Sequence, residues 1–124
     1  MNLKEKNILV IDDTASIRTF LRMSLEAEGA TFHGAATAQA GLDMVYAIKP
    51  DLVILDLGLP DKDGVDILPD IKNSHGARTL PVVILTVRKG KYIVDNVLEK
   101  GANAYLNKPF IVDDLLEVIH NNIA

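Results

Sequence analysis

The segment Leu52–Leu55 reads Leu-Val-Ile-Leu and is followed at once by Asp56. A strand with one solvent-facing side alternates apolar and polar residues, and this run does not alternate. Unbroken runs of this kind are typical of strands covered on both faces, which indicates a parallel sheet. Similar runs stand at Asn7–Ile11 and Val82–Leu85, and two weaker, mixed runs stand at Thr31–Ala35 and Ala104–Leu106. The sequence therefore predicts five strands, with the mixed runs nearer the sheet edges.

Segments with helical periodicity separate these runs. In Ala15–Glu28 the apolar residues recur at spacings of three and four, which places them on one helix face, and Gly29 follows as a stop. Helices are also predicted from the N-cap Thr37 to Ile48, over Lys91–Lys100, and from Val112 or Asp113 through Ile119. The segment Val65–Asn73 has Pro69 inside it. Because proline removes a backbone donor and clashes with the preceding turn, we expect a late start or a distortion there.

Strands and helices thus alternate five times along the chain. Right-handed crossovers then predict an α/β fold of the flavodoxin-like type, a (βα)5 doubly wound three-layer sandwich around a five-stranded parallel sheet. The chain has 124 residues, so we expect a single domain over residues 1–124.

The composition excludes several classes of protein. Hydrophobic residues make up 48% and charged residues 24%, which is an ordinary globular balance. Cysteine is absent, so there is no disulfide or cysteine–zinc site. The net charge is −4 and there is no long basic run, which argues against direct nucleic-acid binding. No apolar stretch approaches the ~18 residues of a membrane span and no signal peptide is recognisable, so we expect a cytoplasmic protein.

Chemically active side chains follow the predicted strands. Asp12 and Asp13 follow the first run, Asp56 the third, Thr86 the fourth and Lys108 the fifth. In an open α/β sheet, ligands bind beyond the carboxyl ends of the strands. We therefore expect three carboxylates, a hydroxyl and an ammonium to meet at one edge of the sheet.

A magnesium-dependent phosphoryl acceptor is the chemistry that this set of groups suits. Three neighbouring carboxylates repel one another, and a hard divalent cation with oxygen ligands relieves that repulsion. A carboxylate beside such an ion can attack a phosphoryl group, while the ammonium and the hydroxyl bind its oxygens. Simpler roles are the alternative: Asp12, Asp13 and Thr14 as helix caps, Asp56 as a turn residue, Thr86 as a strand-end hydroxyl, and Lys108 as a surface lysine before Pro109.

Four stretches of the chain closely resemble the response-regulator receiver domain of two-component signalling (CheY-like). They are ILVIDDT at 8–14, LVILDLGLPDKDG at 52–64, VVILTVR at 82–88 and GANAYLNKPF at 101–110. The resemblance covers nearly the whole chain, in order and with matching spacing. It implies a phosphoacceptor signalling domain rather than an enzyme with turnover, beyond self-phosphorylation and slow autodephosphorylation.

The resemblance also implies a role for each site residue. Asp56 is expected to be the phosphorylated residue, with Mg²⁺ bound by Asp13, by Asp12 through water, by Asp56, and by the backbone carbonyl of Gly58. Thr86 and Lys108 are expected to contact the phosphoryl group. Tyr105 matches the switch aromatic that acts with Thr86, although plain packing is its alternative. The Lys108–Pro109 peptide is expected to be cis.

The resemblance further implies the partners and points to some departures. A histidine kinase or histidine phosphotransfer protein would donate the phosphoryl group, and an unknown output domain or protein would read the switch. Asn103 and Ala104 replace the paired aspartates of a frequent subgroup, so we expect a monomer or a weak homodimer. Val87 stands where the family usually has a small residue and predicts a crowded phosphoryl pocket, while Arg88 is placed to reach over the site.

Three other functions are the alternatives to a phosphoacceptor. A haloacid-dehalogenase-type phosphohydrolase normally has a second aspartate two residues after its nucleophile, where this chain has Gly58, or Thr14 if Asp12 were the nucleophile. A flavodoxin-like FMN carrier needs a phosphate-binding loop after the first strand, and Asp12 and Asp13 would repel a phosphate there. The third is a receiver-fold interaction module that no longer signals by phosphate.

Overall fold

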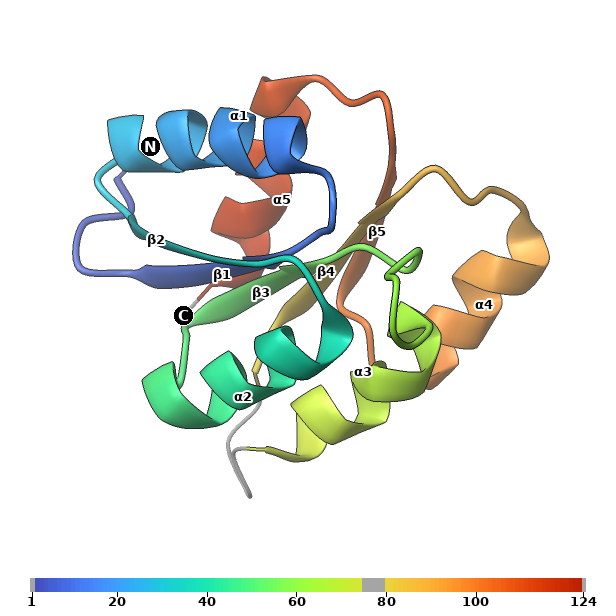
Figure 1. Ribbon diagram of the computed structural model, residues 1–124. Coiled ribbons are helices and arrows are strands. Elements are labelled where there is room, and N and C mark those ends of the chain that lie inside the picture. Colours follow the sequence, from blue (N-terminus) through green and yellow to red (C-terminus); the bar gives the residue numbers. More distant parts are fainter. Residues whose placement is uncertain (1, 75–79, 124) are drawn as a thin grey trace.

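The computed structural model describes residues 2–74 and 80–123, in which five strands and five helices alternate (Figure 1). The strands are β1 Asn7–Ile11, β2 Thr31–Ala35, β3 Leu52–Leu55, β4 Val82–Thr86 and β5 Ala104–Asn107. The helices are α1 Ala15–Ala27, α2 Ala38–Ile48, α3 Gly64–Asn73, α4 Lys91–Glu99 and α5 Val112–Asn122. The predicted elements are all present, and the predicted bounds agree to within a few residues. None of the described helices is long and apolar enough to cross a membrane.

The strands form one parallel sheet in the order β2-β1-β3-β4-β5. The mixed runs are the two edge strands, β2 and β5, as predicted, and the three central strands are almost wholly buried. The chain turns from one side of β1 to the other between β2 and β3. In sheets of this type, ligands bind at such a switch in strand order, which here lies at the carboxyl ends of β1 and β3.

Helices cover both faces of the sheet, so the domain has three layers (Figure 1). On one face, Leu21 and Leu25 of α1 and Leu115 and Ile119 of α5 pack with Leu52 and Ile54 of β3. On the other face, helices α2, α3 and α4 pack on alternate strand residues, which include Val53 and Leu55. Because successive side chains of a strand point to opposite faces, the unbroken run at β3 supplies both cores.

Helix α3 contradicts the prediction of a late start. It begins at Gly64 and continues through Pro69 to Asn73. Its first turn is capped by the Asp63 carboxylate, which accepts a hydrogen bond from the Val65 N–H at 2.9 Å. The missing N–H of Pro69 removes one helical hydrogen bond, and the buried apolar face of α3 outweighs that loss. The side chains of this face are Val65, Ile67, Leu68 and Ile71.

Candidate functional site

The carboxyl ends of β1 and β3 bring Asp12 and Asp56 together. Ile11 is paired with Leu55 in the sheet register, so the next residue of each strand, Asp12 and Asp56, emerges at the same level. The backbone holds them there, because the Asp56 N–H donates to the Ile11 carbonyl at 2.9 Å and the Asp12 N–H donates to the Ala35 carbonyl at 3.0 Å. Both side chains therefore lie at the switch in strand order.

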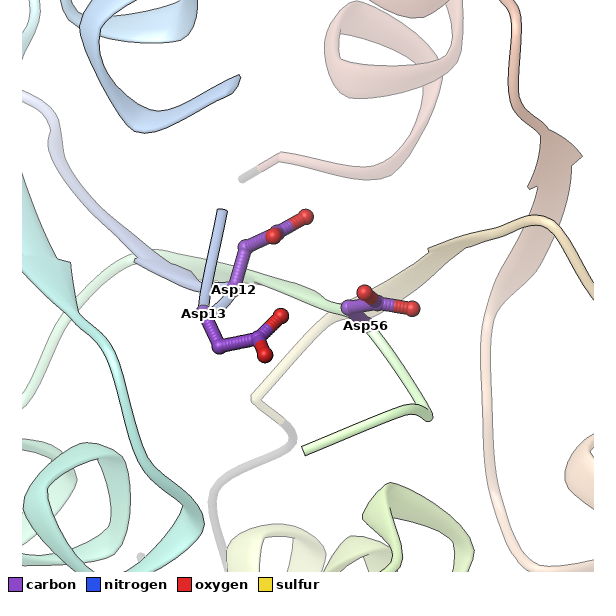
Figure 2. Close-up of side chains that lie close together, drawn as sticks. All are labelled: Asp12, Asp13 and Asp56. Atoms are coloured by element: carbon purple, nitrogen blue, oxygen red, sulfur yellow. The ribbon is translucent and has the colours of Figure 1, made fainter. Parts of the chain in front are cut away.

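Three carboxylates gather at this edge of the sheet (Figure 2). One oxygen each from Asp12, Asp13 and Asp56 lies within 4.8 Å of the others. Asp12 and Asp56 are buried, at 2% and 7% exposure, whereas Asp13 is exposed and turns toward Asp56. Two unit charges this far apart repel by about 3 kcal/mol at an effective dielectric of about 20. The predicted acidic cluster is thus present, and it needs positive charge nearby.

Lys108 supplies one positive charge to the cluster. Its Nζ lies 2.6 Å from Asp12 Oδ2 and 3.1 Å from Asp56 Oδ2, and its side chain is only 12% exposed. Burial alone would lower the pKa of Lys108, but the hydrogen bond and the charge of Asp12, together with those of Asp56, hold that pKa above its ordinary value. The Lys108–Pro109 peptide is cis, as expected. Lys108 is thus a buried part of the site and not a surface lysine.

The first helix does not use these aspartates as a simple cap. The N-cap residue of α1 is Thr14, and its side chain makes no capping hydrogen bond. Asp12 Oδ1 instead accepts from the Thr14 N–H at 2.9 Å, and the Asp12 carbonyl accepts from Arg18 Nη1 at 2.7 Å. The capping alternative is therefore wrong for Thr14, and Asp12 turns its second oxygen to Lys108.

Asp56 is held at the start of a loop that leaves space on one side. Its Oδ1 accepts from the Leu57 N–H at 2.7 Å and more weakly from the Gly58 N–H at 3.4 Å, while Oδ2 faces Lys108. Gly58 is exposed, and nothing lies within 4 Å of the place where a Cβ would stand. A Cβ on Gly64 would lie 2.5 Å from the Asp56 carbonyl oxygen, which is too close for any side chain. Glycine at position 64 therefore lets the first turn of α3 approach the backbone of Asp56.

Thr86 and Tyr105 do not reach the carboxylates directly. The Thr86 side chain is buried, and its Oγ1 accepts from the Arg88 N–H at 3.4 Å. The half-buried Tyr105 donates its hydroxyl hydrogen to the Arg88 carbonyl. Val87 lies between them along the chain, and its side chain is 67% exposed. The crowding of a phosphoryl pocket by Val87 stays a prediction, because the exposure of this side chain does not decide how far it covers the approach to Asp56.

Arg88 extends toward the loop that follows Asp56. Its guanidinium lies 2.9 Å from Asp63 Oδ2 and 3.0 Å from Asp63 Oδ1, and it also donates to the Leu57 carbonyl at 3.4 Å. Arg88 thus reaches the loop after Asp56, and its position over the phosphoryl site itself stays a prediction. Its partner Asp63 was not foreseen, because Asp63 followed by Gly64 resembles an ordinary turn.

A second loop carboxylate, Asp61, holds the start of α2. Its two oxygens accept from the Ala38 and Gln39 N–H groups at 2.8 and 2.9 Å. These hydrogen bonds, that of Gln39 first, lower the pKa of Asp61. Thr37 also caps this helix, as predicted, by accepting from the Ala40 N–H at 3.1 Å. Asp61 is therefore a capping residue and not a member of the acidic cluster.

The ligand atoms of the site fit a hard divalent cation. The side-chain donors are all carboxylate oxygens, which suit Mg²⁺ better than softer metals. Among the described residues, Lys108 is the only cation that forms an ion pair with them. Three carboxylates and one ammonium together carry two negative charges. Asp13 forms no ion pair within residues 2–74 and 80–123.

Comparisons with known proteins point to one family. The sequence profile described as "Response regulator receiver domain" matches residues 8–120. The KDP operon transcriptional regulatory protein KdpE of Escherichia coli (strain K12) is 40% identical over 109 residues, which cover 88% of this chain and 47% of that protein. The DNA-binding transcriptional regulator NtrC of Proteus hauseri is 33% identical over 122 residues, or 98% of this chain and 25% of that protein. The chain spans about half the length of KdpE.

Solved structures show the same fold. A CheY-like receiver domain protein from Methanospirillum hungatei JF-1 superposes with a TM-score of 0.87 at 31% identity, over 94% of this chain and 91% of that one. The BeF3-activated N-terminal receiver domain of RstA from Klebsiella pneumoniae gives a TM-score of 0.85 at 26% identity, over 94% and 97%. Profile, relatives and fold agree, and this chain belongs to the response-regulator receiver domain family of two-component signalling.

Proposed function

We propose that Asp56 accepts a phosphoryl group with the help of one Mg²⁺ ion. The observation that carries this proposal is the meeting of Asp12, Asp13 and Asp56 beside the partly buried ammonium of Lys108. In the reaction, an Asp56 carboxylate oxygen bonds to phosphorus as the bond from phosphorus to the donor breaks. The product is an acyl phosphate, and the donor departs with the electron pair of the broken bond.

The residues around Asp56 have separate roles in this proposal. Asp12, Asp13, Asp56 and the Gly58 carbonyl hold the ion, which when bound neutralises carboxylate charge and attracts phosphoryl oxygens. Lys108 already contacts Asp56 Oδ2 at 3.1 Å, so its ammonium is in place to bind an oxygen of the transferred group. The exposed Gly58 leaves an approach to Asp56 that no side chain of its own covers.

The switch is proposed to act through Thr86 and Tyr105. Phosphorylation adds roughly −1.5 to −2 charge and new acceptor oxygens, by analogy with other phosphorylated side chains. The Thr86 hydroxyl moves to these oxygens and gives up its contact with the Arg88 N–H, and Tyr105 changes position in response. The surface around β5 and α4 then differs between the two states, and an output partner binds one of them more tightly.

The proposal extends to partners and setting. Receiver domains interact with histidine kinases and output domains, so the phosphoryl donor for this chain is a phosphohistidine on a histidine kinase or a histidine phosphotransfer protein. The output domain or protein is unknown, this domain does not bind nucleic acid itself, and it works in the cytoplasm as a monomer or weak homodimer. NtrC is named as DNA-binding, which fits a separate output domain in such relatives.

Intact-mass measurement with acetyl phosphate and Mg²⁺ tests the acceptor. We expect the mass to rise by one phosphoryl group in the wild type, and not in Asp56→Asn or when the metal is chelated. Asp51→Asn is the matched control, because Asp51 precedes β3 at the opposite end of this strand and its carboxylate accepts from the Asn7 N–H at 2.7 Å. Phosphorylation of Asp56→Asn to the wild-type level would show that the acceptor is another residue.

A further inference from the structure

Asn107 bridges the two ends of the short segment that carries Thr86. In the sheet Asn107 pairs with Thr86, and its Nδ2 lies 3.1 Å from the Thr86 carbonyl oxygen and 2.6 Å from the Arg88 carbonyl oxygen. Carbonyl oxygens only accept hydrogen bonds, so the side-chain atom that faces them must be the amide nitrogen. Its two hydrogens thus hold both ends of residues 86–88.

The contacts of this segment converge on Arg88. Its carbonyl accepts from Asn107 and from the Tyr105 hydroxyl, and its N–H donates to Thr86 Oγ1 at 3.4 Å. The Asn107 amide nitrogen also lies 3.3 Å from the Tyr105 hydroxyl oxygen. Both residues of the proposed switch, Thr86 and Tyr105, therefore contact Arg88, and Asn107 contacts Arg88 and the two switch residues.

The guanidinium of Arg88 holds the segment from the opposite side. It bonds Asp63 and the Leu57 carbonyl, both in the loop that follows Asp56. The segment is therefore fixed to β5 through its carbonyls and to the acceptor loop through the arginine side chain. A movement of the Thr86 hydroxyl toward Asp56 breaks its contact with the Arg88 N–H, and a shift of the backbone of residues 86–88 also stretches the bonds to Asn107 and Asp63.

We propose that Asn107 is a positioning residue that stabilises the unphosphorylated arrangement of residues 86–88 and thereby weakens binding of a phosphoryl group at Asp56. This inference rests on the proposed function. The described structure has the Thr86 hydroxyl bonded within its own loop, so the Asn107 bonds belong to the state in which Thr86 is not bound to phosphate. Bonds made in only one of two states bias the equilibrium toward that state.

Beryllofluoride, a mimic of the phosphoryl group, measures this bias without turnover. We titrate it with Mg²⁺ into the wild type and Asn107→Ala, and follow binding by NMR because the chain has no tryptophan. Loss of the bridge is expected to tighten binding by about three- to tenfold, the effect of one or two hydrogen bonds made in one state only. Asn107→Asp keeps the shape but points an acceptor at two carbonyls, so a larger gain is expected.

Asn103 provides a matched control at the other end of the same strand pair. Its Oδ1 accepts from the Val82 N–H at 3.0 Å and from Lys72 Nζ at 2.7 Å, far from the acceptor end. Asn103→Ala is expected to lower the thermal stability while leaving beryllofluoride affinity at the wild-type value. In the Asn107→Ala protein without beryllofluoride, the backbone amide signals of Val87 and Arg88 are expected to shift toward their beryllofluoride-bound positions.

The outcomes separate the inference from the proposed function. Unchanged or weaker beryllofluoride binding in Asn107→Ala, with normal binding in the wild type, overturns the role of Asn107 alone. No binding to the folded wild type overturns both the proposed function and the inference. If Asn107→Ala does not fold, Asn107→Ser removes the same two bonds with a smaller loss of volume and polarity, and the same gain in affinity is expected.

Discussion

The ammonium groups of Lys72, a residue of α3, and of Lys108, which follows β5, lie at opposite ends of the sheet and have different surroundings. Lys72 is half-buried at the amino ends of β4 and β5, where its Nζ contacts the Leu80 carbonyl at 2.8 Å and Asn103 Oδ1 at 2.7 Å. These partners are neutral, and burial lowers the pKa of Lys72. Lys108 meets two carboxylates, and its pKa is raised although burial opposes the rise.

This difference separates a structural end of the sheet from a reactive one. At the amino end, a cation is satisfied by neutral oxygens, and Asp51 accepts from a backbone N–H. At the carboxyl end, three carboxylates share one ammonium, so negative charge remains for a metal ion. Buried carboxylates without enough positive charge nearby reduce the stability of the fold, so binding of a cation at such a site is favourable.

Replacing each lysine by methionine is expected to give the largest difference in stability between the two ends of the sheet. Lys108→Met leaves two buried carboxylates without their cation and is expected to reduce the free energy of unfolding by about 3 to 5 kcal/mol. Lys72→Met removes a charge whose partners among the described residues are neutral, so a loss of no more than about 1 kcal/mol is expected. Urea unfolding measures both.

Magnesium sharpens the same comparison. We expect Mg²⁺ to restore part of the stability lost in Lys108→Met, because the ion replaces the missing positive charge, and to have only its wild-type effect in Lys72→Met. Equal losses in the two variants would mean that the carboxylates do not depend on Lys108 for compensation.

As the pH rises, the contributions of Lys108 and Lys72 to the free energy of unfolding are expected to change in opposite directions. The raised pKa of Lys108 makes its contribution full below its ordinary pKa of 10.5 and lost as the pH rises through the folded-state value. The lowered pKa of Lys72 means that the native state binds fewer protons just below pH 10.5, so its contribution to stability rises with pH there. The slope of unfolding free energy against pH in this lower range should therefore fall in Lys72→Met. If the slope in Lys72→Met equals that of the wild type, the pKa of Lys72 is not lowered by folding.

Replacing Asp61 tests a carboxylate outside the cluster and should have the smallest effect. Asp61→Ala removes two capping bonds from α2, so a small decrease in melting temperature is expected at neutral pH. The lowered pKa of Asp61 means that this contribution is present above the ordinary value of 3.8 and is lost as the pH falls through the folded-state pKa. Beryllofluoride binding should be unaffected, and a marked loss of it would place Asp61 in the site.

The sequence predicts the sheet well because each strand is a local apolar run. The run at Leu52–Leu55 identifies a strand with two buried faces, and the residue after each run marks the carboxyl edge. Asp12, Asp56 and Lys108 meet there because parallel strands end at one edge, which is a property of the topology. The late start expected from Pro69 does not occur, because the buried apolar face of α3 overrides the local effect of the proline.

The contacts of the loops could not be predicted in the same way. Asp63 followed by Gly64 reads as a turn, and only the folded loops show that Asp63 also pairs with Arg88, twenty-five residues away. The bridge made by Asn107 depends on how the chain leaves β4, which periodicity does not encode. The place of the Val87 side chain is likewise set by the turn after β4, which leaves it 67% exposed.

Calorimetric titration with Mg²⁺ tests most directly whether the carboxyl end of the sheet is a metal site. Asp13→Asn is the decisive variant, because Asp13 is exposed and its loss leaves both Lys108 ion pairs intact. We predict saturable binding of one ion by the wild type and by Asp51→Asn, and binding weaker by about tenfold or more in Asp13→Asn, which corresponds to at least about 1.4 kcal/mol. Equal binding by wild type and Asp13→Asn, or no saturable binding by the wild type, would contradict the account.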